Sequence, residues 1–276
     1  MTTIEARDSV VEASLAYDEF ATRYDGLLTE NRINAYMRRE MTRTLLSTFE
    51  PGSRLVELGC GTGDEAIALA RSGCTVIALD PSAHMVKIAS NKVHEARLEN
   101  AIKFQVSTAA HAAGRLAEVG IAKRFDGAYA SFSLSYEPDL PDVSSGLATL
   151  VVEGGKFVMA HMNRLCAVEL IAAVLSGRPD IAGRRIGDRT VHKVGDFMTP
   201  IFPRSTREIL RAFHPHFTLE TVRALPAILP PHYANRLLLR WPLALELLRE
   251  VDPFVGSLPV IRQMGDQNVL RLRRTA

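Results

Sequence analysis

The sequence has few cysteines, and their placement suits neither a metal site nor a set of disulfides. Cys60, Cys74 and Cys166 are the only three in 276 residues, and no Cys-x-x-Cys pair occurs. An odd and widely spaced set excludes a zinc ligand framework and a disulfide framework. Such cysteine usage is typical of a protein that works in a reducing cytoplasm.

Long apolar runs and an excess of one charge are also missing. No stretch of about 18 apolar residues occurs, so we expect no membrane-spanning helix. The first residues, MTTIEARDSVVEAS, are polar and include acids, which does not fit a secretory signal peptide. The formal net charge is only +2, so no global field favours nucleic acid. These absences predict a cytoplasmic protein without a nucleic-acid partner.

The pattern of apolar segments predicts an α/β fold. With 47% hydrophobic residues, the 276-residue chain can build one large core with insertions. Segments of strand length alternate with segments of helix length, which indicates a mostly parallel sheet with helices on both faces. The expected strands are 54–58, 74–79, 102–106, 125–131 and 155–161, and the expected helices are 8–24, 29–49, 63–72, 82–98, 111–118, 140–152 and 163–175.

Breaks in this alternation divide the chain into four parts. Residues 1–50 are expected to form an N-terminal helical cover, and residues 51–162 the cofactor-binding core. Residues 163–203 are expected to be a lid insertion, because the Arg-, Gly- and Pro-rich part after residue 177 reads as a loop. Residues 204–276 return to the core.

The last part is expected to hold one more helix and two more strands. Ser205 and Glu208 form a capping-box pattern that starts the helix. The strands are expected at 217–225 and 268–272, as an antiparallel pair. Between them, the apolar and proline-rich residues 226–266 predict a helical insertion over the active-site edge of the sheet.

The most informative stretch is LVELGCGTGDEAIALA, residues 55–70. An apolar run ends in Gly59, Gly61 and Gly63, which permit positive φ and close approach of a ligand. The helix that follows directs free N–H groups and a positive dipole end into the same space. Asp80 ends the next apolar run, where a carboxylate can accept hydrogen bonds from two ribose hydroxyls. This unit predicts a site for the nucleoside end of a cofactor.

At these residues the chain resembles the class I S-adenosylmethionine (SAM)-dependent methyltransferases of small molecules. Residues 56–63, VELGCGTG, resemble the first motif of that family, and residues 78–82, ALDPS, with Met85, resemble the second. The resemblance covers residues 15–162 well and the remainder loosely. It implies a Rossmann-like seven-stranded sheet with helical lid or cap insertions. It also implies SAM as cofactor and S-adenosylhomocysteine as product, and no metal is expected.

The resemblance implies a set of cofactor contacts. They are Glu57, Gly59, Cys60, Gly61 and Gly63 in the first motif, Asp80, Pro81, Ser82 and Met85 in the second, and Ser131 and Phe132 after the fourth strand. Asp80 is expected to hold the ribose and Met85 to contact the adenine. The family often has an acidic residue after the third strand; Thr108 and Ala109 stand there instead, so Thr108 or a backbone group is expected to serve.

Residues 17–25, YDEFATRYD, resemble the N-terminal Y-D-x-x-A-x-x-Y-D segment of small-molecule methyltransferases. Tyr17, Phe20, Ala21 and Tyr24 share one face of a helix. That face is expected to cover the cofactor, with Tyr17 and Tyr24 among its contacts, because a tyrosine ring attracts a sulfonium cation. A helix that only packs on the sheet edge is the alternative.

Catalytic residues leave a weaker signal, since methyl transfer needs alignment and exclusion of water more than a fixed triad. The candidates are His161, Tyr24 and Tyr136 for catalysis, and Glu137, His192 and His232 for contact with the substrate. Tyr136 and Glu137 follow the carboxyl end of the fourth strand, where ligands bind in open α/β sheets. His161 ends the fifth strand as a possible general base; a rim histidine bonded to the lid is an equal reading.

Two further stretches have open interpretations. Arg178, Arg184, Arg185, Arg189 and Lys193 are either a grip for an anionic group on the substrate or a solvated loop. The apolar segment 237–245 is an apolar acceptor pocket, a homodimer contact, a membrane-surface helix or plain packing.

The sequence therefore predicts a SAM-dependent methyltransferase acting on a small or medium-sized organic molecule, with oxygen favoured over carbon as acceptor. One alternative is an NAD(P)-dependent oxidoreductase, which the G-x-G-x-G spacing and the lack of a Tyr-x-x-x-Lys pair disfavour. Another is a non-catalytic SAM-binding subunit. A nucleic-acid methyltransferase is disfavoured because the N/D-P-P-Y/F signature and a basic excess are both absent.

Overall fold

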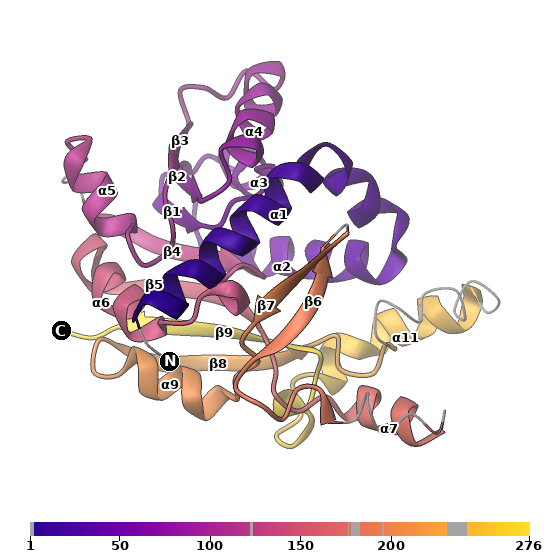
Figure 1. The fold of residues 1–276 in the computed structure, drawn as a ribbon. Coiled ribbons are helices and arrows are strands. Elements are labelled where there is room, and N and C mark those ends of the chain that lie inside the picture. Colours follow the sequence, from indigo (N-terminus) through magenta and orange to yellow (C-terminus); the bar gives the residue numbers. More distant parts are fainter. Residues whose placement is uncertain (1–2, 122–123, 176, 178–182, 195, 231–241) are drawn as a thin grey trace.

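A seven-stranded sheet with helices on both faces forms the centre of the protein (Figure 1). The structure is a computed structural model. It describes residues 3–121, 124–175, 177, 183–194, 196–230 and 242–276. The strands of the main sheet are β1 Arg54–Leu58, β2 Thr75–Asp80, β3 Ile102–Val106, β4 Phe125–Ser131, β5 Val151–Met162, β8 Phe217–Leu225 and β9 Gln267–Arg274.

The strand order is β3-β2-β1-β4-β5-β9-β8. The first five of these strands pair in parallel, and β9 runs antiparallel to both β5 and β8. The chain reverses its direction of winding between β1 and β4, which is where ligands bind in open α/β sheets. This is the mostly parallel, Rossmann-like sheet that the sequence predicts.

Two layers of helices cover the sheet. Their bounds are α2 Arg32–Thr48, α3 Asp64–Arg71 and α4 Ala83–Glu95 on one face, and α5 Ala112–Glu118, α6 Leu140–Leu150 and α9 Thr206–Phe213 on the other. Successive strand side chains point to opposite faces, so Leu55 belongs to the first core and Val56 and Leu58 to the second. Strands buried on both faces explain the nearly continuous apolar runs in the sequence.

Most expected boundaries lie within a few residues of the observed ones, apart from the first helix, which extends from Thr3 to Glu30, and the junction before the fifth strand. Helix α6 ends at Leu150 and β5 begins at Val151, several residues before the expected position 155. The pairing of β5 with β4 shifts register between its two ends, and Gly154 has a φ of +76°. Gly154 and Gly155 therefore lie in an irregular part of β5, which begins earlier than expected. They do not separate α6 from this strand.

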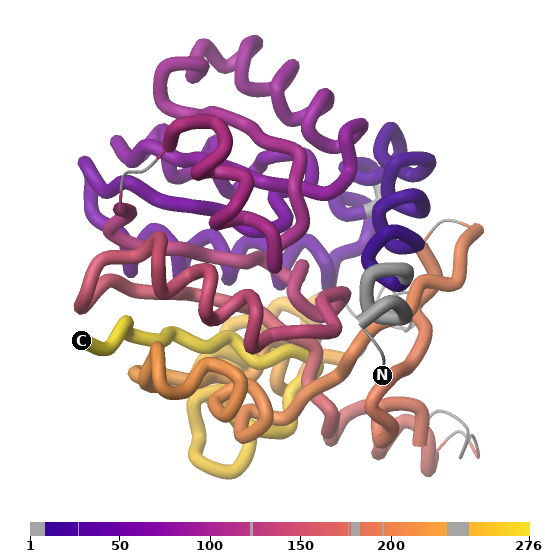
Figure 2. The backbone as a smooth tube through the Cα atoms, turned by 60° about the vertical axis from the view of Figure 1, so that its left-hand side comes forward, coloured from indigo at the N-terminus to yellow at the C-terminus, as the bar shows by residue number. Residues whose placement is uncertain are grey.

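The lid insertion is only partly helical, which corrects the prediction. It contains α7, Ala167–Leu175, followed by a two-stranded antiparallel sheet of β6, Thr190–Val194, and β7, Phe197–Ile201. This β6–β7 hairpin lies against the long first helix α1, Thr3–Glu30 (Figure 2). Val194 packs there with Ala16 and Phe20 in a small separate core.

Of the insertion between β8 and β9, the structure describes residues 226–230 and 242–266, and Asp266 lines the cavity described below. The helix α11 of this insertion, Pro242–Val255, packs against β8 and supplies no residue to that cavity. Asp252 anchors it, because its Oδ2 accepts a hydrogen bond from Tyr36 Oη of α2 at 2.9 Å. His232 and residues 237–241 lie outside the described residues.

The helix predicted at Ser205 is confirmed. Ser205 Oγ accepts the Glu208 backbone N–H at 3.3 Å, and the Glu208 carboxylate accepts the Ser205 N–H at 2.8 Å. Among the described helices, none combines the length and the apolarity that crossing a bilayer requires.

Candidate functional site

A cavity of about 330 Å³ opens at the carboxyl ends of the parallel strands. This volume lies at the lower end of the range for small-molecule sites. Its walls come from α1, α2, the glycine turn after β1, the tip of β2, the end of β4, the short helix η1 (Leu134–Tyr136), the β6–β7 hairpin and the start of β9. Nearly every part of the chain therefore contributes to one site.

The glycine turn needs residues without side chains at two positions that line the cavity. Gly59 has a φ of +75° and Gly61 a φ of +51°. A Cβ on Gly59 would lie 2.2 Å from Ser133 Cβ, and one on Gly61 would lie 3.6 Å from the Tyr24 ring. Gly63 does not line the cavity; it precedes α3 and lets the turn pack closely on Ala89 of α4.

Asp80 is fixed at the cavity by the backbone around it. Its Oδ2 accepts the Gly61 N–H at 2.8 Å, and its Oδ1 accepts the Ser82 N–H at 2.9 Å. Burial raises the pKa of the Asp80 carboxyl to about 6, although these two backbone donors oppose the shift. The carboxylate is thus held in one orientation with lone pairs left for a ligand.

Most of the other expected cofactor residues also line the cavity. They are Cys60, Pro81, Met85, Thr108, Ala109, Ser131 and Phe132. Ser82 does not line the cavity, since its Oγ caps α4 by accepting the Met85 N–H at 3.0 Å. Its hydroxyl also donates to Asp18 Oδ1 at 2.5 Å. The role of Ser82 is therefore to shape the wall.

Glu57 corrects the sequence reading, because it lies behind the glycine turn and lines no part of the cavity. Its side chain is fully buried, and burial and the nearby Glu65 raise the pKa of its carboxyl well above the usual range. The cavity instead contains Glu65 of α3 and Arg38 of α2, whose Nη2 lies 2.6 Å from Glu65 Oε2. Nothing in the motif pointed to Arg38, which precedes it in the chain.

Helix α1 presents the expected face to the cavity. Tyr17, Phe20 and Tyr24 line it. The Tyr17 and Tyr24 rings meet edge to face, with centroids 5.9 Å apart, and Tyr17 meets Tyr136 in the same way at 5.5 Å. The result is an aromatic wall opposite the glycine turn.

The polar side of α1 is tied to the edges of the cofactor site. Asp25 Oδ1 accepts a hydrogen bond from Thr62 Oγ1 at 2.6 Å, and its Oδ2 lies 3.1 Å from Lys92 Nζ. Farther along the helix, Ser14 Oγ donates to the Pro81 carbonyl at 3.0 Å. These contacts tie α1, which lines the cavity, to the glycine turn, to α4 and to the residue after β2.

We expect Asp25→Ala to speed dissociation of S-adenosylhomocysteine roughly threefold to tenfold, because its charge-assisted contacts with Thr62 and Lys92 are lost. We expect only a small change in this rate, because the Asp25 side chain is 43% exposed and solvent screens its pair with Lys92. Stopped-flow displacement measures the rate. Glu19→Ala, on an exposed position of the same helix, is the control; equal rates for both variants would contradict this role of Asp25.

A chain of hydrogen bonds crosses the other end of the cavity. Tyr17 Oη donates to Tyr136 Oη at 2.7 Å, and Tyr136 Oη lies 3.2 Å from His192 Nδ1. Since Tyr136 accepts from Tyr17, its own proton is available to His192, whose Nδ1 then accepts and whose Nε2 carries the ring proton. The chain joins α1, η1 and β6, three elements that are far apart in the sequence.

Glu137 also lines the cavity, as expected, and it is 6% exposed. Burial raises the pKa of its carboxyl to about 7, although the backbone N–H of Asp139 and the charge of Arg204 act in the opposite direction. A carboxyl whose pKa is raised in this way is better suited to proton exchange near neutral pH than an ordinary glutamate.

His161 is not placed as a general base. It is fully buried and lines no part of the cavity. Its Nδ1 lies 2.9 Å from the Met162 carbonyl, and its Nε2 lies 3.3 Å from Arg204 Nη1. A carbonyl only accepts and a guanidinium only donates, so the ring is neutral. Burial and the Arg204 charge lower the pKa of His161 to about 3, so it is a buried histidine bonded to Met162 and Arg204, neither of which belongs to the lid at residues 163–203.

Two of the lid arginines, Arg184 and Arg185, bind carboxylates of the protein itself, so these two do not form the expected grip for the substrate, and Arg189 is exposed. Arg185 is buried, and its Nη2 lies 2.5 Å from both Glu169 Oε2 and Asp266 Oδ1. Arg184 Nε lies 2.6 Å from Glu169 Oε1. Arg178 lies outside the described residues, whereas Lys193 lines the cavity.

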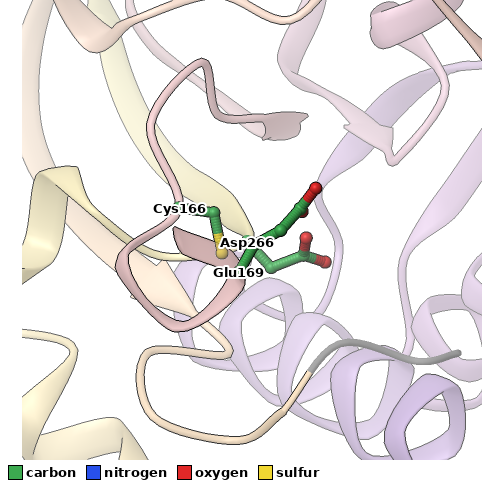
Figure 3. A group of neighbouring side chains, drawn as sticks. All are labelled: Cys166, Glu169 and Asp266. Atoms are coloured by element: carbon green, nitrogen blue, oxygen red, sulfur yellow. The ribbon is translucent and has the colours of Figure 1, made fainter. Parts of the chain in front are cut away.

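The same carboxylates stand with Cys166 in a group close enough to share a metal ion (Figure 3). The Arg185 guanidinium lies at hydrogen-bond distance from both acids, and Arg184 also pairs with Glu169, so two guanidinium groups balance the two carboxylates. Burial also raises the pKa of the Cys166 thiol to about 11, so it stays protonated at neutral pH. The group is therefore a buried ion-pair cluster that ties the lid to the start of β9.

Comparison with known proteins gives one family match and several relatives. Residues 30–245 match the family described as "Methyltransferase domain". Ubiquinone biosynthesis O-methyltransferase from Xanthomonas campestris pv. campestris (strain B100) is 29% identical over 150 residues, 54% of this chain and 58% of that protein. Methyltransferase phqN from Penicillium fellutanum is 31% identical over 110 residues, 39% of this chain and 32% of that protein. The chain thus spans less than two thirds of these relatives.

Solved structures share the fold at low sequence identity. A putative SAM-dependent methyltransferase from Listeria monocytogenes has a TM-score of 0.59 at 13% identity, covering 88% of this chain and 99% of that one. The [4+2]-cyclase SpnF has a TM-score of 0.58 at 17% identity, covering 86% and 80%. Geranyl diphosphate C-methyltransferase from Streptomyces coelicolor, solved with S-adenosylhomocysteine, has a TM-score of 0.56 at 16% identity, covering 86% and 79%.

Proposed function

The chain belongs to the methyltransferase domain family, and on this premise we propose that it is a class I SAM-dependent methyltransferase that methylates a hydroxyl oxygen of a small or medium-sized organic acceptor. One observation carries the proposal. The cavity has a nucleoside-binding half, made by the glycine turn and Asp80, and a hydroxyl–hydroxyl–imidazole chain made by Tyr17, Tyr136 and His192 in its wall.

The residues present fit the cofactor. In the proposed complex, the Asp80 carboxylate would accept both ribose hydroxyls, and Met85 and Pro81 would flank the adenine. Arg38 lines the same cavity and is suited to bind the amino-acid carboxylate, since a guanidinium pairs well with that group. SAM supplies an electrophilic methyl group on a sulfonium, which becomes a neutral thioether after transfer. The tyrosines of α1 lie over this half and exclude water.

The hydroxyl chain provides a route for the proton of the acceptor. As the acceptor oxygen bonds to the methyl group, its O–H bond breaks and the proton passes to Tyr136 Oη. The proton already on Tyr136 passes to His192 Nδ1, and the imidazole becomes an imidazolium. The positive charge that leaves the sulfonium thus ends on His192. Tyr136 need not ionise, which matters because burial raises the pKa of its hydroxyl above the usual range.

Carbon methylation is the second candidate, and Glu137 is the observation that favours it. A buried carboxyl with a pKa of about 7, in the wall of the cavity, can take a proton from a carbon acid. The curated relatives from Xanthomonas are named as O-methyltransferases, which favours oxygen.

The cavity also bears on the form of the acceptor. Val10, Ala13, Val194 and Ile201 line it, so we propose that the acceptor has an apolar part. Lys193 is the cavity residue suited to an anionic group. We also propose that the chain divides into four parts. They are a helical cover at residues 1–50, a SAM-binding core at 51–162, a lid at 163–203 and a C-terminal part of the core at 204–276.

Titration calorimetry with S-adenosylhomocysteine tests the cofactor half, and absence of binding would contradict the proposal. Incubation with methyl-labelled SAM and a panel of phenols, catechols and enols tests the reaction. Carbon NMR distinguishes an O-methyl from a C-methyl product, and the latter would favour the Glu137 alternative. Preferential binding of NADH would favour an oxidoreductase, and cofactor binding without turnover of any acceptor a non-catalytic subunit.

We expect Tyr136→Phe and His192→Gln each to lower kcat about 100-fold, the range for loss of general base assistance, while KM for SAM stays unchanged. Each substitution interrupts the proton route but leaves the glycine turn and Asp80 in place. Steady-state kinetics with a phenol acceptor measures kcat and the KM for SAM separately. His216→Gln, on the turn before β8, is the control. An unchanged kcat for His192→Gln would rule out this route.

A further inference from the structure

Gln267, the first residue of β9, has a buried side-chain amide that makes no hydrogen bond with the described residues. The residue lines the cavity and is 7% exposed. Its Oε1 is shielded from solvent and has no partner. A buried carbonyl oxygen without a partner is costly, so one that persists in a residue of a cavity wall indicates a group that a ligand satisfies.

The sheet register places Gln267 on the same face and edge as the cofactor residues. Ser131 at the end of β4 pairs with Ala160 of β5, and Ala160 pairs with Val269 of β9. Gln267 lies two residues from Val269 toward the cavity and pairs with Met162. Residues two apart in a strand share a face, so Gln267 and Ser131 face the same side.

The spacing between neighbouring strands gives the distance from Gln267 to the cofactor residues. Gln267 lies two strands from Ser131 and four strands from Asp80, in the order β2-β1-β4-β5-β9. With neighbouring strands roughly 4.8 Å apart, these separations are roughly 10 Å and 19 Å. The cofactor proposed above reaches from β2 to β4, so the segment from β4 to β9 is left for the acceptor. Ser131 Oγ, at the beginning of that segment, is also buried without a partner.

The backbone beside Gln267 is held in place from several sides. The Asp266 N–H donates to the Pro226 carbonyl at 3.0 Å. The Asp266 carbonyl accepts the Asn163 N–H at 3.0 Å and Arg185 Nη1 at 3.0 Å. The buried cluster of Figure 3 therefore fixes the residue that precedes Gln267. A side chain on such rigid support has the precision that recognition needs.

We propose that Gln267 recognises a neutral polar group, a hydroxyl or carbonyl, at the far end of an elongated acceptor. A carboxamide both donates and accepts, which complements such groups. The nearby charges of Asp266 and Arg185 neutralise each other and call for no charged ligand. The inference rests on the proposed function, since it assumes that SAM fills the other half of the cavity. It makes Gln267 a specificity residue and predicts an acceptor about two rings long.

Two biphenyl probes test the proposal, with binding measured by calorimetry in saturating S-adenosylhomocysteine. 4,4′-Dihydroxybiphenyl has hydroxyls at both ends, and 4-hydroxybiphenyl lacks the far one. We expect the wild-type protein to bind the first roughly tenfold more tightly, the worth of one good hydrogen bond to a buried group. Gln267→Met, of similar volume, is expected to bind both equally. Equal wild-type affinity for the two probes, or affinity for neither, overturns the proposal.

Thermal unfolding provides a readout that needs no acceptor. Gln267→Met removes an amide without partners, so we expect an unchanged or higher Tm and unchanged affinity for S-adenosylhomocysteine. Asn268→Leu is the matched control, because the Asn268 amide donates to Thr206 Oγ1 at 3.0 Å and its loss should lower the Tm. An equal drop in Tm for Gln267→Met would show a structural amide and overturn the proposal. Failure of S-adenosylhomocysteine to bind the wild-type protein would instead contradict the proposed function.

Discussion

Asp80→Asn is expected to lower the affinity for S-adenosylhomocysteine about 100-fold, on the order of 3 kcal/mol. The reason is that two hydrogen bonds from ribose hydroxyls to a charged carboxylate are lost or weakened, each worth roughly 1.5–3 kcal/mol. The neutral amide keeps the shape of the side chain but replaces one acceptor with a donor. It would also turn that donor toward the backbone N–H of either Gly61 or Ser82, which now donate to Asp80.

Calorimetry on the purified protein measures this change. Asp126→Asn is the control, since Asp126 Oδ2 also accepts a backbone N–H, from Arg54 at 2.7 Å, but at the opposite end of the sheet. It should leave the affinity unchanged. Wild-type affinity in Asp80→Asn would show that the nucleoside binds elsewhere.

The same carboxyl predicts a pH dependence of cofactor binding. Burial raises the pKa of Asp80 to about 6 in the free protein, and ribose binding requires the ionised form. The affinity for S-adenosylhomocysteine should therefore be constant above pH 7 and fall roughly tenfold per unit below pH 6, as protons compete with the ligand. Asp80→Asn should remove this dependence. A flat profile for the wild-type protein would contradict the assignment.

In the free protein, the pH dependence of the folding stability has the opposite sign to the pH dependence of cofactor affinity. Because the folded pKa of Asp80 lies above its ordinary value, the folded state binds more protons between about pH 4 and pH 6. The contribution of this group to stability is therefore present at low pH and is lost as pH rises through about 6. A bound cofactor stabilises the ionised form of Asp80. The increase in folding stability that S-adenosylhomocysteine causes should therefore become larger as the pH rises from about 4 to about 6.

Gly59→Ala is expected to abolish measurable cofactor binding and to lower the Tm. The new Cβ would lie 2.2 Å from Ser133 Cβ, far inside contact distance, and the φ of +75° is itself unfavourable for alanine. The turn or the backbone after β4 must move, and both line the cavity. Differential scanning fluorimetry with and without S-adenosylhomocysteine measures both effects.

Gly120→Ala separates the strain from the clash. Gly120 has a φ of +73°, almost the value of Gly59, but a Cβ there meets nothing within 4 Å. It should cost only roughly 1–2 kcal/mol of stability and leave cofactor binding unchanged. Ser133→Gly in the Gly59→Ala background removes the obstructing atoms and should restore part of the binding. Equal behaviour of the two alanine variants would show that the close contact does not matter.

The nucleoside half of the site was determined largely by the sequence. Gly59, Gly61 and Asp80 lie on consecutive strand–helix units, and parallel strands bring their carboxyl ends to one edge of the sheet. Short-range conformational requirements therefore fix both the residue types and their positions. The helical face of Tyr17 and Tyr24 follows in the same way from a spacing of seven residues. Glu57 escaped this logic, because its side chain points behind the turn.

The acceptor half was decided by the tertiary structure. Tyr17, Tyr136 and His192 are joined by hydrogen bonds that span 119 and 56 residues of sequence. Their meeting depends on how α1 and the β6–β7 hairpin pack, and the short hairpin segments gave no distinct periodic signal. Gln267 gains its significance only from the strand order, which sets it two strands from β4.

His161 shows the limit most clearly. The sequence placed it correctly at the end of the fifth strand, but its side chain is fully buried against Met162 and Arg204. Adjacent strand residues point to opposite faces, so an offset of one residue decides between a cavity and a core. Short-range sequence patterns thus determined the position of the proposed cofactor site. Long-range packing decided which side chains face the proposed methyl acceptor.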